Sequence, residues 1–169
     1  MPLRDPDARF PEAREAFAHG KRPVGLVGGH GLEITFPVTE DELAERVGSG
    51  DLPVLASPAI VARVERTAVQ LLRVSLPPEL TTAGASFVLS HEAPTPLGGT
   101  ITLTVRLEPG DGRKLTFAFV ASDPSGEVAR GSHVRVIVDR AAFLASAEGR
   151  AGVSPGRTIG ASGSGPPSR

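Results

Sequence analysis

A change of hydrophobic period near residue 77 constrains the fold of this chain more than any other sequence feature. Before it, Ser57-Pro58 is a helix start pattern and Pro77-Pro78 is a stop, which predicts one helix over about residues 58–74 with Ser57 as its N-cap. After it, apolar and polar residues alternate, as they do in strands with one buried face. The sequence therefore predicts a long helix followed by a sheet.

The predicted helix is amphipathic, since its apolar residues recur at three- and four-residue spacing. These residues are Ile60, Val61, Val64, Ala68, Leu71 and Leu72. Strands are predicted at about 31–38, 84–91, 100–108, 114–123 and 127–139. Turn sequences at 109–112 and 123–126 close hairpins and indicate an antiparallel meander. One amphipathic helix against one antiparallel sheet is an α+β layer pair.

The two ends of the chain differ from its middle. Residues 1–30 are rich in Pro, Arg and Gly, and we interpret them as an N-terminal extension with one short helix around 11–19. From residue 149 onward Gly, Ser, Pro and Arg dominate, which predicts a disordered tail over 149–169. The folded domain is therefore expected at 31–148.

Composition excludes several classes of function. The net charge of −1, without a basic block, argues against nucleic acid or an anionic membrane as a main partner. Without cysteine there is no thiolate nucleophile, and the four histidines do not form a metal-spaced pair, so no metal or other cofactor is predicted. No apolar run is long enough to cross a bilayer, and no signal-peptide core is present, so a cytoplasmic protein is expected.

Glu65 is the most informative polar residue of the predicted helix. Its neighbours at three and four residues, which are Val61, Ala62, Ala68 and Val69, cannot pair with a carboxylate. A carboxylate among apolar groups is expected to be desolvated, and desolvation suits it to acid–base chemistry. The simpler interpretation is a boundary residue that reaches solvent or an arginine from another element.

Four more residues are candidates for a site. Ser57 is first of all a helix cap, at an end where backbone N–H groups also attract negative charge. His91 ends its strand and is either a strand-end residue or, near a carboxylate, a general base or proton donor. Gly84 is either a turn residue or a backbone donor to an oxyanion. Arg135 shares a strand face with His133, and this basic pair either is solvated or meets a phosphate or carboxylate.

From about residue 55 to 143 the chain resembles the fluoroacetyl-CoA thioesterase group of hotdog proteins. Members of this group share a Thr or Ser before the helix, a helical Glu and a His on the next strand, and these positions read Ser57, Glu65 and His91. The segment His-Glu-Ala-Pro-Thr-Pro-Leu-Gly from His91 resembles the family's His-x-Ala-x-x-Pro-x-Gly turn. Arg-Gly-Ser-His-Val-Arg, which ends at Arg135, resembles its Gly-x-Gly/Ser-x-His-x-Arg strand.

The resemblance implies a hotdog fold, in which an antiparallel sheet wraps around one long helix. It also implies a homodimer that hydrolyses an acyl-CoA thioester at the subunit interface, with the pantetheine arm entering between subunits. Glu65 would be the catalytic carboxylate, as nucleophile or as base toward water, and His91 would polarise the carbonyl or move the proton. Ser57 would orient the carboxylate or the thioester, Gly84 would contribute its N–H, and Arg135 would position the substrate or its CoA portion.

Two departures limit what the resemblance implies. Residues 47–53 read Val-Gly-Ser-Gly-Asp-Leu-Pro and lack the aromatic lid of the fluoroacetate specialist, so we predict a small or medium acyl group without naming it. Ser57 replaces the commoner Thr, which keeps the hydroxyl but loses a methyl group. Two alternatives stay open, because fold does not prove function: a non-catalytic module that binds acyl-CoA, and a hotdog hydratase or dehydratase.

Overall fold

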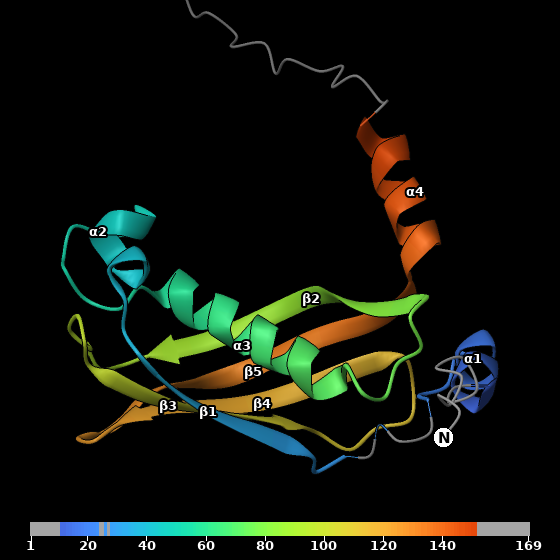
Figure 1. Ribbon diagram of the computed structural model, residues 1–169, viewed down its shortest axis with the longest axis horizontal. Helices are drawn as coiled ribbons and strands as arrows, with labels where there is room; N and C mark the ends of the chain where they lie inside the picture. The colour runs from blue at the N-terminus through green and yellow to red at the C-terminus, as the bar shows by residue number, and fades with distance from the viewer. Residues whose placement is uncertain (1–10, 24–25, 27, 152–169) are drawn as a thin grey trace, which may run out of the picture.

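The computed structural model describes residues 11–23, 26 and 28–151. Its strands are β1 (Gly31–Pro37), β2 (Leu80–His91), β3 (Thr100–Leu107), β4 (Lys114–Asp123) and β5 (Gly126–Asp139). Its helices are α1 (Pro11–Ala18), the 3-10 turn η2 (Glu40–Glu42), α2 (Ala44–Val47), α3 (Ser57–Leu72) and α4 (Arg140–Ala151). Helix α3 lies across one face of a single antiparallel sheet (Figure 1). The predicted α+β layer pair is therefore confirmed.

The strand order is β1-β3-β4-β5-β2. The predicted meander is correct for β3, β4 and β5, but β2 pairs with β5 instead of its successor β3. Between β1 and β2 the chain crosses the sheet as α3, so β1 and β2 form opposite edges (Figure 1). This crossing buries the apolar face of α3, and it places β2 where its outer side is unpaired within the described chain.

The core lies between α3 and the inner face of the sheet. The side chains of α3 that are buried there are Ala59, Ile60, Val64, Thr67, Ala68 and Leu72. The sheet contributes alternate residues, as its period of two requires, among them Ile101, Leu103, Val105, Leu107, Leu115, Phe117 and Ile137. Each large side chain buried in this way stabilises the fold by about 1.5–3 kcal/mol.

Three local expectations need correction. Helix α3 begins at Ser57, and its N-cap is Ala56, whose backbone is extended (φ −78°, ψ 140°). Ser57 is thus the first helical residue, and in the described chain its hydroxyl bonds to His91 instead of to a backbone N–H of the helix. Strand β2 begins four residues earlier than predicted, because Leu80 already pairs with Asp139 of β5. Residues 149–151 belong to α4, and the rest of the predicted tail lies outside the described residues.

The described part of the N-terminal segment contacts the sheet. Arg22 donates to the carbonyl oxygens of Glu108 and Lys114, and Leu26 is buried in the core. The short helix expected around 11–19 is present as α1. Across residues 11–23, 26 and 28–151, no helix has the length and apolar character needed to cross a membrane.

Candidate active site

Ser57 and His91 lie together at the N-terminal end of α3. The Ser57 hydroxyl is 2.9 Å from Nδ1 of His91, the last residue of β2. Because Ser57 is not the helix cap, its hydroxyl is available for this hydrogen bond. The other ring nitrogen, Nε2, is buried without a partner in the described chain. Burial lowers the pKa of His91, so its ring is neutral near pH 7.

Glu65 lies two turns further along α3, against strand β5. Its Oε1 is 3.4 Å from Nη1 of Arg135 and 3.5 Å from Nε2 of His133. The Glu65 side chain is 43% exposed, whereas those of Arg135 and His133 are only 7% and 2% exposed. The simpler of the two interpretations therefore describes the geometry: the carboxylate meets both solvent and an arginine from another element.

Arg135 is held by several groups of the chain itself. Its Nε donates to the Thr82 hydroxyl and its Nη2 to the Thr82 carbonyl oxygen, both at 2.8 Å. Its Nη1 lies 3.1 Å from Nε2 of His133. All three guanidinium nitrogens thus have partners in the protein, and the side chain is buried. This geometry favours a role in fixing Glu65 over direct contact with a substrate.

His133 completes this buried cluster. Its Nδ1 is 3.0 Å from the carbonyl oxygen of Ser86, which only accepts hydrogen bonds, so Nδ1 is the protonated nitrogen. Nε2 then has a lone pair for the N–H of Arg135. Burial and the nearby Arg135 charge both lower the pKa of His133. We therefore treat His133 as a neutral group that orients the guanidinium.

Gly84 allows the close approach of Glu65 to the sheet. A Cβ atom at this position would lie 2.6 Å from Oε1 of Glu65 and 3.4 Å from Cε1 of His133, so a side chain would displace the carboxylate. Gly84 lies inside β2 and does not begin it, and the β2–β5 register breaks between Gly84 and Ser86. Such bulges are common beside active sites, where they redirect side chains.

The five predicted residues thus form two groups. Ser57 and His91 form one, and Glu65, Gly84 and Arg135 form the other. Ser57 and Glu65 are eight residues apart on one helix, or about 12 Å along its axis. In the described part of the chain no hydrogen bond or ion pair joins Glu65 to His91. A substrate that contacts both groups must therefore lie between them.

Sequence reasoning missed Thr82, which holds Arg135 at two points. The period of two could have found it, because Thr82 is two residues before Gly84 on the same face of β2, and Gly84 pairs with Arg135. The search for groups of three or more potential metal ligands found none within the described residues.

Comparison with known proteins identifies what this arrangement resembles. Residues 38–141 match the family model described as fluoroacetyl-CoA-specific thioesterase. The fluoroacetyl-CoA thioesterase of Streptantibioticus cattleyicolor is 30% identical over 92 residues, which make up 54% of this chain and 66% of that protein.

Solved structures extend the likeness to the fold. A structure of the fluoroacetyl-CoA thioesterase FlK has a TM-score of 0.70 and 25% identity, with 75% of this chain and 98% of that chain covered. A hot-dog-like protein from Thermanaerovibrio acidaminovorans also has a TM-score of 0.70, with 23% identity and coverage of 76% and 96%. The predicted hotdog fold is therefore confirmed.

Proposed function

The chain belongs to the fluoroacetyl-CoA-specific thioesterase family, and from this membership we propose that it hydrolyses a small or medium acyl-CoA thioester to the free acid and CoA. The main support in the structure is the Glu65 carboxylate. It is fixed from behind by Arg135 and lies against the backbone of Gly84, yet it is 43% exposed. A carboxylate that is both fixed and accessible can act on a bound thioester or on water.

Hydrolysis requires a new C–O bond at the thioester carbon and loss of the C–S bond. As a base, Glu65 takes a proton from water while the water oxygen bonds to the carbon; the C–S bond then breaks, and the leaving sulfur takes that proton, which restores the carboxylate. As a nucleophile, Glu65 forms the C–O bond itself, and water then hydrolyses the resulting anhydride and restores the carboxylate. Arg135 acts as a positioning residue in both routes, because it holds the carboxylate and has no free nitrogen.

His91 and Ser57 are proposed to contact the thioester group on the side opposite Glu65. When the Ser57 hydroxyl donates to Nδ1 of His91, Nε2 carries the ring proton. Nε2 is then the donor for the carbonyl oxygen or the leaving sulfur. Nε2 has no hydrogen-bond partner among the described residues, which makes its N–H the donor proposed for the substrate. Gly84 is proposed to add its backbone N–H to the developing oxyanion.

A homodimer is the proposed assembly. Within the described part of the chain, strand β2 is a twelve-residue edge strand whose outer side is unpaired, and its Val88 is 64% exposed. Pairing with the same strand of a second copy would remove this edge and extend the sheet across both subunits. Because Gly84 and His91 both belong to β2, that pairing would place the site at the subunit interface. Light scattering coupled to size-exclusion chromatography measures the assembly directly.

The activity test is CoA release, followed with a thiol reagent, across a panel of acyl-CoA esters. The variants Glu65→Gln and His91→Ala are each expected to lower turnover by roughly a hundredfold or more. Glu45→Gln on α2 removes an exposed carboxylate and serves as the matched control, with unchanged turnover expected.

Three results would contradict this proposal. Full activity in the Glu65 and His91 variants would show that these residues are not catalytic. CoA binding by calorimetry without turnover of any ester would favour the non-catalytic module. Loss of enoyl-CoA absorbance without CoA release would favour a hydratase.

A further inference from the structure

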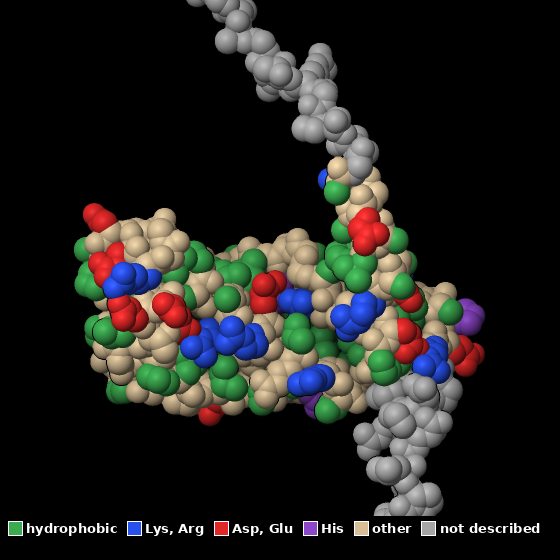
Figure 2. All heavy atoms as spheres, turned by 45° about the horizontal axis from the view of Figure 1, so that its top comes forward, with side chains coloured by type: hydrophobic (Ala, Val, Ile, Leu, Met, Phe, Trp, Pro, Cys, Tyr) green, Lys and Arg blue, Asp and Glu red, His purple; other side chains and the backbone are tan. Residues whose placement is uncertain are grey.

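Helix α4 is exposed along its whole length. None of its residues, Arg140–Ala151, is buried against the described chain. Two of them are large and apolar: Phe143 is 48% exposed and Leu144 is 57% exposed. Figure 2 shows hydrophobic side chains at the surface where α4 leaves the sheet. Residues 142–151 also lie after the end of the family match at residue 141, so the family does not explain this helix.

A helix of this length needs a surface to pack against. Helix α4 has twelve residues, and isolated helices of about that length are only marginally stable in water. Its large apolar residues lie on one side, because Phe143, Leu144 and Ala147 are separated by one residue and by one turn. We therefore expect this side of α4 to be covered in the assembled protein.

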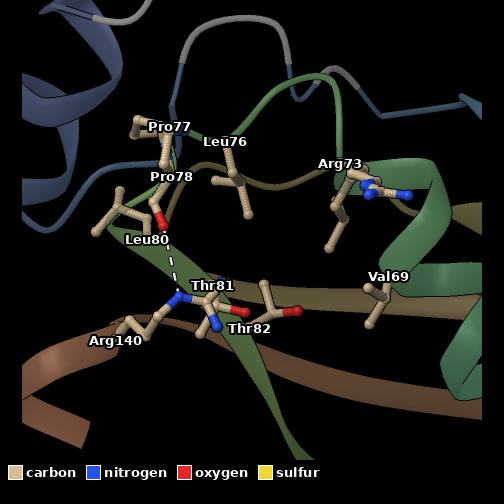
Figure 3. Close-up of a pocket in the computed structure, with 10 residues that line it drawn as sticks. Val69, Arg73, Leu76, Pro77, Pro78, Leu80, Thr81, Thr82 and Arg140 are labelled. Carbon is tan, nitrogen blue, oxygen red and sulfur yellow. Dashed lines mark hydrogen bonds between the residues drawn. The ribbon is translucent and has the colours of Figure 1, made fainter. Parts of the chain in front are cut away.

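The start of α4 is fixed, and it directs the helix away from the core of its own subunit. Asp139 accepts from the N–H of Ala142 at 2.8 Å, and the N–H of Arg140 donates to the Glu79 carbonyl oxygen at 2.9 Å. Figure 3 shows the Arg140 side chain, whose Nε is 3.5 Å from the Pro78 carbonyl oxygen, at the margin of a cavity. This cavity of about 460 Å³ lies beyond Glu65 along α3, and Arg140 is the one α4 residue that lines it. The apolar side of α4 is therefore not packed into the nearest hollow of its own chain.

A second exposed apolar surface lies at the opposite end of β2, where the strand ends at His91. It consists of Leu52, which is 61% exposed, and Leu97, which is 56% exposed. A β-bridge between Val54 and Pro96 brings the segments of these two leucines side by side. We call Leu52 and Leu97 the Leu52 patch.

The proposed pairing of β2 with a second copy brings α4 and the Leu52 patch together. A two-fold axis perpendicular to the sheet makes the two β2 strands antiparallel, so the start of β2 in one subunit lies beside the end of β2 in the other. Helix α4 begins beside the start of β2, because Leu80 pairs with Asp139, and it extends past the β2 edge (Figure 1). It is about 18 Å long, whereas neighbouring strands are about 4.8 Å apart, so it is long enough to reach across the partner's edge.

We propose that α4 of each subunit packs Phe143 and Leu144 on the Leu52 patch of the other subunit. This inference rests on the homodimer of the proposed function and adds to it a contact that the β2 pairing alone does not make. Symmetry produces the contact twice. Each copy lies at the end of β2 that carries the partner's His91, so each site is bordered by the α4 helix of the other subunit.

Cross-linking tests this contact in the full chain. The protein has no cysteine, so introduced thiols are the only ones present. Ser146→Cys is one turn after Phe143, and Asp51→Cys is next to Leu52; both positions are exposed, and both substitutions keep the apolar residues of the contact. The double variant is treated with a short bismaleimide and separated on a denaturing gel. Ser146→Cys with Thr35→Cys is the matched control, because Thr35 is exposed on β1 at the opposite edge of the sheet.

The expected result is a covalent dimer in the Ser146 and Asp51 pair and none in the control pair or in either single variant. Equal cross-linking of the control pair would show random collision and overturn the inference. A dimer by light scattering without this cross-link would also overturn it and leave the proposed homodimer intact. A monomer by light scattering would overturn both, whereas the assay of CoA release decides the activity separately.

The dissociation constant of the dimer provides a second test. Phe143→Ser and Leu144→Gln replace each apolar residue with one of similar helix propensity, so α4 itself is retained. Each variant should raise the dissociation constant by roughly tenfold or more, since buried apolar anchors account for much of the affinity of an interface. Val120→Ser, at a position on β4 that is 42% exposed, is the control and should leave the constant unchanged. Equal dissociation constants in all three variants would overturn the inference.

Discussion

The two polar groups along α3 are built differently. The Glu65 group rests on a buried arginine with bonds to Thr82 and His133, so its geometry is fixed by several contacts at once. Among the described residues, the Ser57 and His91 pair has one side-chain hydrogen bond, and Nε2 of His91 has no partner. In the first group the guanidinium nitrogens of Arg135 are all bonded within the protein. In the second group Nε2 of His91 remains available to a ligand. Substitutions of the residues that hold Glu65 should therefore lower both stability and activity. Substitutions of Ser57 and His91 should lower mainly activity.

Arg135→Met should have the largest effect. It removes the donors to Thr82 and leaves Nε2 of His133 without a partner, and each buried unsatisfied group costs about 1–3 kcal/mol. We expect a loss of about 3 kcal/mol in the free energy of unfolding, measured with urea, and turnover reduced by more than a hundredfold. The variant Arg135→Lys should recover little of the lost stability or turnover, because one ammonium group cannot replace the planar set of guanidinium donors. Unchanged stability would show that the buried cluster does not support the fold.

His91→Ala should separate activity from stability. Turnover is expected to fall by about a hundredfold or more, while the free energy of unfolding changes by about 1 kcal/mol or less, since one hydrogen bond is lost and one orphan atom is removed. Paired rate and urea measurements check this. His19→Ala, at an exposed position after α1, is the control that should change neither. If His91→Ala lowered the free energy of unfolding strongly but kept the turnover per folded molecule, His91 would support the fold and not the activity.

Ser57→Ala should give a smaller loss of activity, roughly tenfold, because the hydroxyl only orients the His91 ring. Since Ser57 is not the helix cap, the free energy of unfolding should change by less than about 0.5 kcal/mol, whereas loss of a cap costs about 1 kcal/mol. Ser57→Thr should keep both activity and stability. A clear loss of stability in Ser57→Ala would restore the capping role that the sequence suggested.

The last expected effect is a loss of stability in mild acid, which needs no substitution. Burial lowers the pKa of both His91 and His133. Below about pH 6.5 the unfolded chain therefore takes up protons that the folded chain does not, and stability falls as the pH decreases toward the folded pKa values. Each histidine contributes a slope of up to about 1.4 kcal/mol per pH unit. Urea unfolding at pH 7.5 and pH 5.5 measures the loss.

His91→Ala and His133→Gln should each reduce this pH dependence, and His19→Ala should not. Equal dependence in all three variants would show that other groups cause it. The comparison between the two polar groups would then rest on the substitution data alone.

Much of the fold could be predicted from the sequence because its signals are local. The Ser-Pro start and Pro-Pro stop bound α3 within two residues, and the alternation along 100–107 identifies the buried face of β3. Helix α4 was not predicted, because residues 140–151 have a weakly apolar face that is exposed in the structure. The start of β2 was placed too late, since its pairing with β5 is a contact with distant sequence.

The candidate site shows the same division. The residue types and spacing of Ser57, Glu65 and His91 could be identified along the chain, and so could the basic pair of His133 and Arg135. Their partners could not. Whether Glu65 is desolvated or paired depends on Arg135, which is 70 residues away in sequence. Whether Ser57 caps the helix or meets His91 depends on where β2 ends.

By itself, then, the sequence determined the helix, the strands and the chemically active side chains, because period, turn residues and spacing act over a few neighbours. Only the tertiary structure decided the strand order, the two polar groups and the cavity beyond Glu65. These arise when α3 crosses the sheet and places β2 beside β5, a set of long-range contacts that burial of the core selects and that no short segment encodes.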